Sequence, residues 1–268
     1  MNCIVHLSDL HRGAHATPDV DDALVTLCHE LAPALVIASG DLSNRGRVAE
    51  LELASTLLER LPAPTLVVPG NHDIPYAFPA RFTQPWRAFE TVYGATRSIH
   101  TGEGFVAVGL NSVRPWRHQG GRLSEESLAF AATALQAAPT DALRIVVLHH
   151  HLAGAPWRAS RKFPLKHRDQ ALAALADAGA DLVVGGHIHQ ASVAERHEFT
   201  VVDGGARPLV VATAPGFGRP RPRRSGEAQG LNVIRWDDVE VSVETRIWDR
   251  VGFVATGRRQ FPRYASPL

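Results

Sequence analysis

The chain has few cysteines and no long apolar segment, and each shortage excludes a class of protein. Only two of its 268 residues are cysteines. Cys3 and Cys28 have neither the spacing of a metal-binding cluster nor the number needed for a disulfide framework, so we expect two buried thiols. No segment is long enough to span a bilayer, and the N-terminus lacks the basic flank and apolar core of a signal peptide. We therefore expect a cytoplasmic protein without a membrane partner.

Neither positive nor negative charge dominates the sequence. The 28 lysines and arginines nearly match the 27 acidic residues, which leaves a formal net charge of +1. Such a balance disfavours nucleic acid as the main partner. The length suits one large α/β domain or two small ones. We predict a single domain over residues 1–268, with a motif-bearing core at 1–190, a strand-rich part at 191–255 and an irregular tail at 256–268.

Histidine, by contrast, is abundant at 14 residues, and many of these residues follow apolar segments. Short apolar runs that predict buried strands alternate with helical patterns, which is typical of an α/β fold. We expect strands at 2–8, 34–38, 65–69, 144–148 and 181–184, a hairpin at 98–112, and helices at 17–31, 48–61, 124–137 and 166–178. Polar residues directly follow each of the five strands. Because strand ends meet at one edge of such a sheet, we expect these residues to lie close together.

Alternating segments after residue 191 predict antiparallel sheet. The expected strands are 197–202, 207–214, 230–236 and 240–248. Between two of them, the arginine-rich loop at 216–226 is broken by proline. We interpret this loop as a solvated surface segment, with contact to phosphate or nucleic acid as the less favoured alternative.

The first two strand ends carry carboxylates. Asp9 and His11 are two residues apart, so in extended geometry their side chains leave the same face and can reach one cation. Gly40 allows a sharp turn that leaves the Asp41 carboxylate uncovered. Because a carboxylate has two oxygens, one for each ion, we expect Asp41 to bridge two cations about 3.5–4 Å apart. A Gly-Asp pair alone is equally typical of a β-turn or a helix N-cap.

The other three strand ends supply an amide and histidines. Asn71 and His72 follow the third strand, and three consecutive histidines from His149 follow the fourth. His187 and His189 follow the fifth. Imidazole and carboxylate groups at strand ends suit borderline divalent ions such as iron, manganese and zinc. These residues therefore predict a metal site.

Together the motifs D-x-H, G-D, G-N-H-D, H and G-H-x-H, in this order, resemble the calcineurin-like metallophosphoesterase superfamily over about residues 4–190. The strings HHH and GHIHQ look most like its class III cyclic-nucleotide phosphodiesterase group. The resemblance implies a four-layer α/β/β/α sandwich of two mixed sheets with two metal ions per chain. It assigns one ion to Asp9, His11, His189 and Asp41, and the other to Asp41, Asn71, His149 and His187.

The resemblance also implies a catalytic role for His72 as a proton donor or charge stabiliser at the phosphate or leaving-group oxygen. The alternative is that His72 only orients Asp41 or its neighbours. We interpret Asp73 as a turn or supporting residue. Period-two geometry would let His151 face the same way as His149, so its contribution stays open.

Three further residues have uncertain roles. Arg45 stands at the offset from the second motif where protein serine/threonine phosphatases carry a phosphate-binding arginine, but the rest of their pattern is missing. We interpret Arg45 as a surface or rim residue, with phosphate contact as the alternative. Trp116 and Trp157 could stack on a base, although we favour core packing for both.

The predicted function is hydrolysis of small phosphodiesters, with a cyclic nucleotide as candidate substrate, by a water activated between two metals. One alternative is a broader phosphoesterase for glycerophosphodiesters, phosphonate esters or triesters, with specificity set by loops at 75–93, 113–122 and 152–165. Another is a metal-binding scaffold without catalysis. The net charge disfavours a nuclease. Relatives often dimerise, so a second copy of the chain is a candidate partner.

Overall fold

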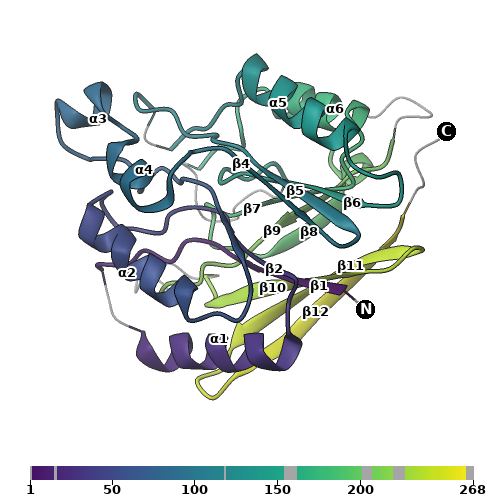
Figure 1. Cartoon of the computed structure of the whole chain (residues 1–268), viewed down its shortest axis with the longest axis horizontal. Helices are drawn as coiled ribbons and strands as arrows, with labels where there is room; N and C mark the ends of the chain where they lie inside the picture. Colours follow the sequence, from purple (N-terminus) through teal and green to yellow (C-terminus); the bar gives the residue numbers. More distant parts are fainter. Residues whose placement is uncertain are drawn as a thin grey trace.

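Two six-stranded sheets face each other in the computed structural model, which describes residues 2–14, 17–117, 119–153, 162–200, 207–219 and 227–263 (Figure 1). The first sheet has the order β12 (Phe253–Pro262), β11 (Glu240–Trp248), β10 (Gly230–Trp236), β1 (Asn2–Leu7), β2 (Leu35–Ala38), β3 (Thr65–Val67). The second has the order β4 (Ser98–Gly102), β5 (Phe105–Gly109), β6 (Leu143–Val147), β7 (Leu182–Gly185), β9 (Val210–Thr213), β8 (Ser192–Glu195). Both sheets are mixed: in the first, parallel β1 to β3 form one side and antiparallel β10 to β12 the other, and in the second, parallel β5, β6, β7 and β9 are flanked by antiparallel β4 and β8.

Helices cover the outer face of each sheet (Figure 1). The first sheet carries α1 (Pro18–Leu31) and α2 (Val48–Glu59), and the second carries α5 (Glu125–Gln136) and α6 (Arg168–Asp177). In α1 the buried positions recur at helical spacing, since Val20, Leu24 and Leu27 all face the sheet. The four-layer α/β/β/α prediction is confirmed.

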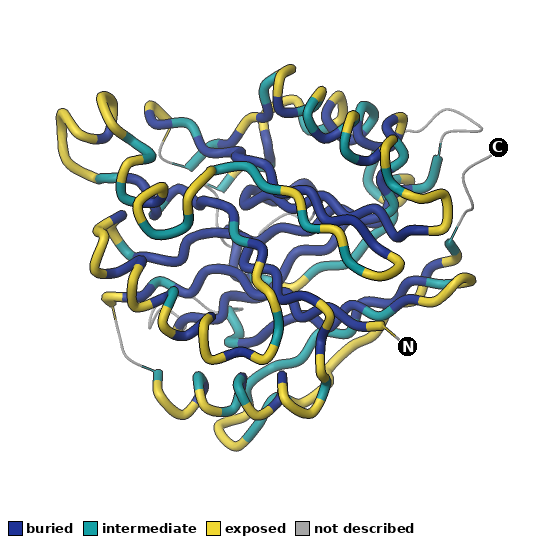
Figure 2. Tube along the Cα trace, in the orientation of Figure 1, coloured by how far each residue is buried: buried dark blue, intermediate teal, exposed yellow. Residues whose placement is uncertain are grey.

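The hydrophobic core lies in three layers, one beneath each pair of helices and one between the sheets. In the middle layer Ile37 of the first sheet and Val147 of the second belong to the same cluster of buried side chains. Figure 2 shows the resulting pattern, with buried strands inside and exposed helix faces outside. Cys3 and Cys28 are buried free thiols, as predicted. The helices in the described part of the chain are too short or too polar to traverse a bilayer.

The predicted tail at 256–268 is wrong for the part that the structure describes. Residues 256–262 belong to β12, which pairs along its length with β11. Nearly every residue of β12 is exposed, because the strand is at the edge of the sheet. An edge strand with little buried surface needs no apolar alternation, so its sequence gave no strand signal.

Two smaller predictions about the second half also need correction. The expected strand at 197–202 is replaced by β8, which ends at Glu195, and by a short 3₁₀ helix at Arg196–Glu198. The helix is favoured locally, because the side chain of Glu198 accepts a hydrogen bond from the backbone N–H of Glu195. β9 is parallel to β7, so the parallel α/β pattern continues one strand further than expected. Residues 201–202, Trp157 and 220–226 of the arginine-rich loop lie outside the described residues.

Candidate metal centre

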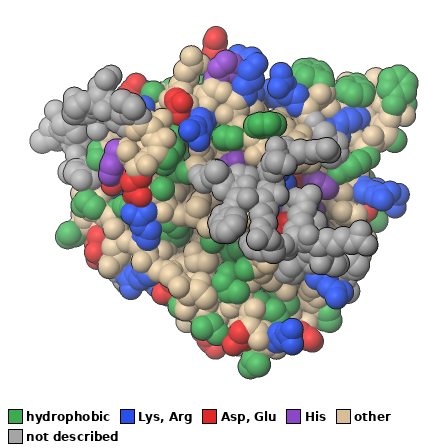
Figure 3. Space-filling model, turned by 180° about the vertical axis from the view of Figure 1, so that it is seen from behind, with side chains coloured by type: hydrophobic (Ala, Val, Ile, Leu, Met, Phe, Trp, Pro, Cys, Tyr) green, Lys and Arg blue, Asp and Glu red, His purple; other side chains and the backbone are tan. Residues whose placement is uncertain are grey.

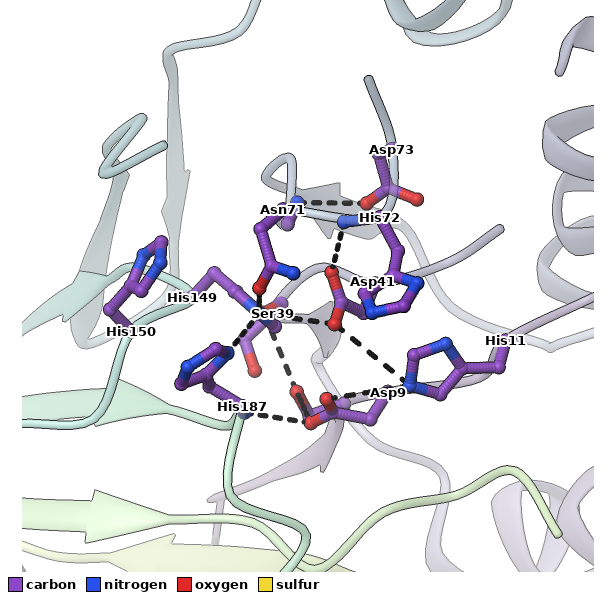
Figure 4. A network of polar contacts seen from close by, with 12 residues as sticks. Asp9, His11, Ser39, Asp41, Asn71, His72, Asp73, His149, His150 and His187 are labelled. Carbon is purple, nitrogen blue, oxygen red and sulfur yellow. Dashed lines mark hydrogen bonds and ion pairs between the residues drawn. The ribbon is translucent and has the colours of Figure 1, made fainter. Parts of the chain in front are cut away.

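The candidate ligands all follow the carboxyl ends of parallel strands, and the structure brings them to one place (Figure 4). The residues gathered there are Asp9 and His11 after β1, Asp41 after β2, Asn71 after β3, His149 after β6, and His187 and His189 after β7. Asp41 lies between two groups of side chains in Figure 4. The expectation that these residues lie close together is therefore confirmed, but their strands belong to two facing sheets and not to one.

Four side chains direct potential lone pairs at one point. Nε2 of His149 lies 3.2 Å from Oδ1 of Asn71, 3.2 Å from Nδ1 of His187 and 3.3 Å from Oδ2 of Asp41. Nδ1 of His149 lies 2.8 Å from the carbonyl oxygen of Ser39, which can accept a hydrogen bond from an N–H at that position. With metal–ligand bonds of about 2.1 Å, ligand atoms of one ion lie roughly 3.0–3.4 Å apart, so the observed spacings fit a bound cation.

The carboxylates at this centre make His149 a strong base. Burial alone would lower the pKa of His149, but the charges of Asp41 and Asp9 raise it to about 9. Burial lowers the pKa of His187 well below its usual range, so that imidazole is neutral. Protons and metal ions compete for such nitrogen atoms. The chemistry of this donor set therefore fits a divalent ion.

Asp9, His11 and His189 form a second group that could hold a metal ion. Nε2 of His189 lies 3.1 Å from Nε2 of His11 and 3.1 Å from Oδ1 of Asp9. Burial lowers the pKa of His11 to about 3, so its imidazole is neutral. Burial would raise the pKa of Asp9, but His189 lowers it well below its usual range, so the carboxylate stays charged. A carboxylate between imidazoles suits the same class of borderline ions.

Asp41 serves both groups through one oxygen. Its Oδ2 is 3.3 Å from Nε2 of His149 and 3.9 Å from Nε2 of His11. Its Oδ1 accepts the backbone N–H of His72 at 2.8 Å. The sequence analysis expected one oxygen for each ion, whereas the structure directs Oδ2 at both groups and uses Oδ1 to hold the chain after Asn71.

The backbone of this centre is unusual, because most candidate ligands have left-handed conformations. Positive φ angles occur at Asp9 (56°), His11 (48°), Asp41 (52°), His187 (75°) and His189 (56°). Such conformations cost about 1–3 kcal/mol each outside glycine and persist only where the surroundings enforce them. Strand geometry alone does not produce these conformations, so they depend on the packing of the loops that carry the ligands.

Close packing around the ligands requires glycine at two positions. A Cβ added to Gly40, which has φ +91°, would lie 2.7 Å from the backbone nitrogen of Gly70. A Cβ added to Gly186 would lie 1.7 Å from the hydroxyl of Ser8. The loops after β1, β2, β3 and β7 are therefore in direct contact, and no side chain fits between them.

Asp73 holds two of these loops together, in agreement with the supporting role predicted for it. Its carboxylate accepts the backbone N–H of Ser43 and the backbone N–H of Gly70, both at 2.8 Å. Burial and the charge of Asp41 raise its pKa to about 6. Asp73 thus connects the loops that carry Asp41 and Asn71 without joining either candidate group.

His72 lies beside the centre and is only half buried. Its ring meets the ring of His11 edge-on at a centroid distance of 4.7 Å, and His11, Asp41 and His72 form a third group of potential ligand atoms. Its Nδ1 lies 2.9 Å from the carbonyl of Asn44. The imidazole can therefore contact a molecule bound at the centre while its backbone is fixed by Asp41.

Two contacts at the centre were missed by the sequence analysis. The hydroxyl of Tyr76 lies 2.8 Å from Nδ1 of His72. Oε2 of Glu227, whose side chain is 4% exposed, lies 3.8 Å from Nδ1 of His189. A carboxylate behind an imidazole orients the ring toward a metal. Tyr76 follows His72 by four residues, which gave a weak signal, whereas no pattern connects Glu227 with His189.

The residues with open roles have clear positions. Arg45 is exposed, as predicted. The prediction of core packing is wrong for Trp116, whose side chain is 70% exposed, because the loop carrying it lies on the surface. His151 stacks on the ring of His187 at 5.8 Å, but among the described residues it belongs to none of the groups that could hold a metal.

Comparison with known proteins agrees with this geometry. The family model for calcineurin-like phosphoesterases matches residues 4–191. The chain belongs to the calcineurin-like phosphoesterase family. This phosphoesterase therefore has a fold and residue groups suited to metal ions, and it is a metal-dependent phosphoester hydrolase.

Its relatives include a protein from a Synechococcus strain described as a probable cyclic nucleotide phosphodiesterase. The two are 28% identical over 209 residues, which cover 72% of this chain and 75% of the relative. The purple acid phosphatase PPD1 from yellow lupin shares the fold with a TM-score of 0.74 at 12% identity, over 98% of this chain and 54% of the lupin chain. A dimetal phosphatase from Danio rerio shares the fold with a TM-score of 0.63 at 12% identity, over 95% of this chain and 98% of the Danio rerio chain.

Proposed function

We propose that the chain is a dimetal phosphodiesterase that hydrolyses small phosphodiesters, with 3′,5′-cyclic nucleotides as the first candidates. The observation that carries this proposal is the convergence of two ligand groups on the single oxygen Oδ2 of Asp41. A shared carboxylate oxygen places two cations close enough to act on one phosphoryl group.

One ion would be held by Asp9, His11, His189 and Asp41, and the other by Asp41, Asn71, His149 and His187. When bound, the two ions would supply a water acidic enough to act as nucleophile and positive charge for the phosphoryl oxygens. Iron, manganese and zinc are the candidate metals, since all three accept imidazole and carboxylate ligands.

His72 would act at the leaving-group side of the phosphate. Its backbone is tied to Asp41, and its half-exposed ring stands against His11 at the border of the centre. From there the imidazole can donate a proton or a hydrogen bond to an ester oxygen, a contribution worth about 10²–10⁴ in rate. This placement favours a catalytic role over the purely orienting one.

The preference for a diester with an organic group is supported by the Synechococcus relative's description and by exposed aromatic side chains. Trp116 and Phe78 are 70% and 82% exposed, and both lie in loops that we expected to set specificity. In Figure 3 hydrophobic side chains gather at the upper right, where α3 (Ala80–Thr83) lies. Planar side chains of this kind can stack on a nucleobase.

A nuclease function is less well supported. Among the described side chains visible in Figure 3, lysines and arginines alternate with aspartates and glutamates. Binding along a nucleic-acid backbone needs a continuous basic surface. The mixed charge on this face agrees with the formal net charge of +1.

The test combines elemental analysis with hydrolysis assays on one sample. We expect about two transition-metal ions per chain and turnover of bis(p-nitrophenyl) phosphate that chelation abolishes and added metal restores. Specificity constants for cyclic AMP, a glycerophosphodiester and a monoester would then rank the substrates. Metal without turnover of any ester would contradict the proposal and favour a binding scaffold.

A cytoplasmic location and a homodimer both stay predictions. Light scattering after size-exclusion chromatography would test the second, because it reports the mass of the particle directly. A mass equal to one chain at assay concentration would exclude the dimer under those conditions.

A further inference from the structure

The phenol of Tyr76 lies against the imidazole of His72. Its hydroxyl is 2.8 Å from Nδ1 and 3.3 Å from Nε2, and the two ring centroids are 5.5 Å apart. We propose that Tyr76 is a positioning residue that fixes the His72 imidazole for its contact with the leaving group. This inference rests on the proposed function and adds a residue outside the phosphoesterase motifs.

Contacts of the His72 ring with Asn44, His11 and Tyr76 differ in kind. The carbonyl of Asn44 can only accept, so it requires a proton on Nδ1. The ring of His11 supports one edge by packing alone. The hydroxyl of Tyr76 is nearer to Nδ1, at 2.8 Å, than to Nε2, at 3.3 Å, so its oxygen can accept from the same N–H and leave Nε2 for a substrate. Tyr76 is thus suited to set the tilt of the ring and so the direction in which Nε2 faces a substrate.

A buried arginine holds the backbone next to Tyr76. Arg81, which is 7% exposed, donates from Nε to the carbonyl of Pro115 at 2.6 Å and from Nη1 to the carbonyl of Pro75 at 3.2 Å. These bonds join the loop of Tyr76 to the loop that carries Trp116. Burying the charged side chain of Arg81, which belongs to α3, is costly unless it has such partners, so these bonds favour the observed conformation of the adjoining loops.

The phenol also keeps its proton at neutral pH. Burial and the charge of Asp41 raise the pKa of Tyr76 to about 12. The phenol therefore stays uncharged, and its contact with the imidazole persists, over the range in which phosphoesterases are assayed. The contribution of Tyr76 to hydrolysis should appear mainly with basic leaving groups, because an acidic leaving group departs without a donated proton.

The decisive variant is Tyr76→Phe, which removes only the hydroxyl. Its matched control is Tyr93→Phe, since Tyr93 donates to the carbonyl of Leu51 in α2, away from the described centre. The substrates are methyl phenyl phosphate and methyl p-nitrophenyl phosphate, which differ in leaving-group acidity. We expect Tyr76→Phe to lower kcat about 10–100-fold on the phenyl ester and less than about 3-fold on the nitrophenyl ester, with KM and metal content unchanged.

A double-mutant cycle shows whether the effect passes through His72. In a His72→Gln background, Tyr76→Phe should have almost no further effect on kcat. In the metal-free protein labelled with ¹⁵N-histidine, Tyr76→Phe should shift the ring-nitrogen resonances of His72, and Tyr93→Phe should not. The His72 resonances are assigned by their loss in His72→Gln.

The outcomes separate this inference from the proposed function. Equal kcat values for Tyr76→Phe and Tyr93→Phe on both esters, or an undiminished loss in the His72→Gln background, would overturn the role of Tyr76. If the wild-type protein hydrolyses neither ester, the proposed function fails. The ring-nitrogen resonances would then still report whether Tyr76 holds His72.

Discussion

The carboxyl edge of the parallel strands and the antiparallel strands β10 to β12 differ sharply in backbone and in charge. At the edge, five non-glycine residues have positive φ angles, and buried carboxylates face buried imidazoles. In the antiparallel region, the register is continuous apart from one irregularity near Thr245, and the charged side chains form partly exposed ion pairs. The edge combines strand ends of both sheets, and β1 connects it to the antiparallel region because β1 pairs with β10.

This difference shows that locally unfavourable conformations and contacts are concentrated at the carboxyl edge. Left-handed residues and converging lone pairs are unfavourable by themselves, and they persist because the surrounding core holds the loops in contact. The antiparallel strands contain neither feature, so substitutions there should have small effects on activity and stability. Substitution of a ligand at the edge should therefore lower activity far more than stability, whereas substitutions in the antiparallel strands should have small effects.

The largest effect is expected for Asp41→Asn. The variant keeps an oxygen for the backbone N–H of His72 but removes the charge shared by the two ligand groups. We expect kcat to fall by about 10³ or more, because both cations lose a ligand. The free energy of unfolding of the metal-free protein, from urea denaturation, should change far less. The control is Asp22→Asn at an exposed ion pair, which should retain full activity.

Addition of metal to the chelated protein should have the next largest effect. Ions that bind only the folded chain stabilise it by about 4 kcal/mol per site when free metal exceeds Kd about 1,000-fold. Thermal unfolding with and without manganese would measure this gain. Asp41→Asn should lose most of it. An equal gain in the variant would show that the metal binds elsewhere.

A matched pair of glycine variants compares the regions directly. Gly40→Ala combines φ +91° with close contacts to Gly70 and to Nδ1 of His149, so we expect a loss of about 2–5 kcal/mol. In β12, a Cβ added to Gly257 meets nothing within 4 Å. Gly257→Ala should change stability by less than about 1 kcal/mol, in the stabilising direction. Equal losses in chemical denaturation would refute the contrast.

The smallest effect is expected for Arg259→Gln in β12. Arg259 makes two hydrogen bonds to the carboxylate of Glu198, at 2.8 and 3.0 Å, but both side chains are well exposed. Water screens such pairs, so the variant should lose less than about 1 kcal/mol at neutral pH.

This small loss should depend on pH in a defined direction. The hydrogen bond from Arg259, and then that from the backbone of Glu195, lower the pKa of Glu198 from 4.5 to about 2. Because the pKa of Glu198 is lower in the folded state, its ionised carboxylate stabilises the folded protein fully at pH values above the unfolded-state pKa. This stabilisation is lost as the pH falls from 4.5 toward 2. Denaturation of wild type and variant at decreasing pH should therefore converge. A difference that grows in acid would refute the assignment.

Much of the fold could be read from the sequence, because buried strands leave a strong signal. The apolar runs before Asp9, Asp41 and His149 became β1, β2 and β6 within a residue or two of the predicted bounds. The edge strand β12 was missed for the opposite reason, since its exposed residues need no apolar pattern. Trp116 was misjudged because a large apolar side chain in a loop gives no indication of whether the loop is covered.

The sequence alone determined which chemical groups follow the strands, because each strand and its adjoining polar residues are local features. Only the tertiary structure decided how those groups share their atoms. It assigned Oδ1 of Asp41 to the backbone of His72 and Oδ2 to both ligand groups, and it brought Tyr76 to His72 and Glu227 to His189. These contacts depend on loop conformations that the packing of two sheets imposes, and apart from the four-residue spacing of His72 and Tyr76 no local pattern in the chain indicates them.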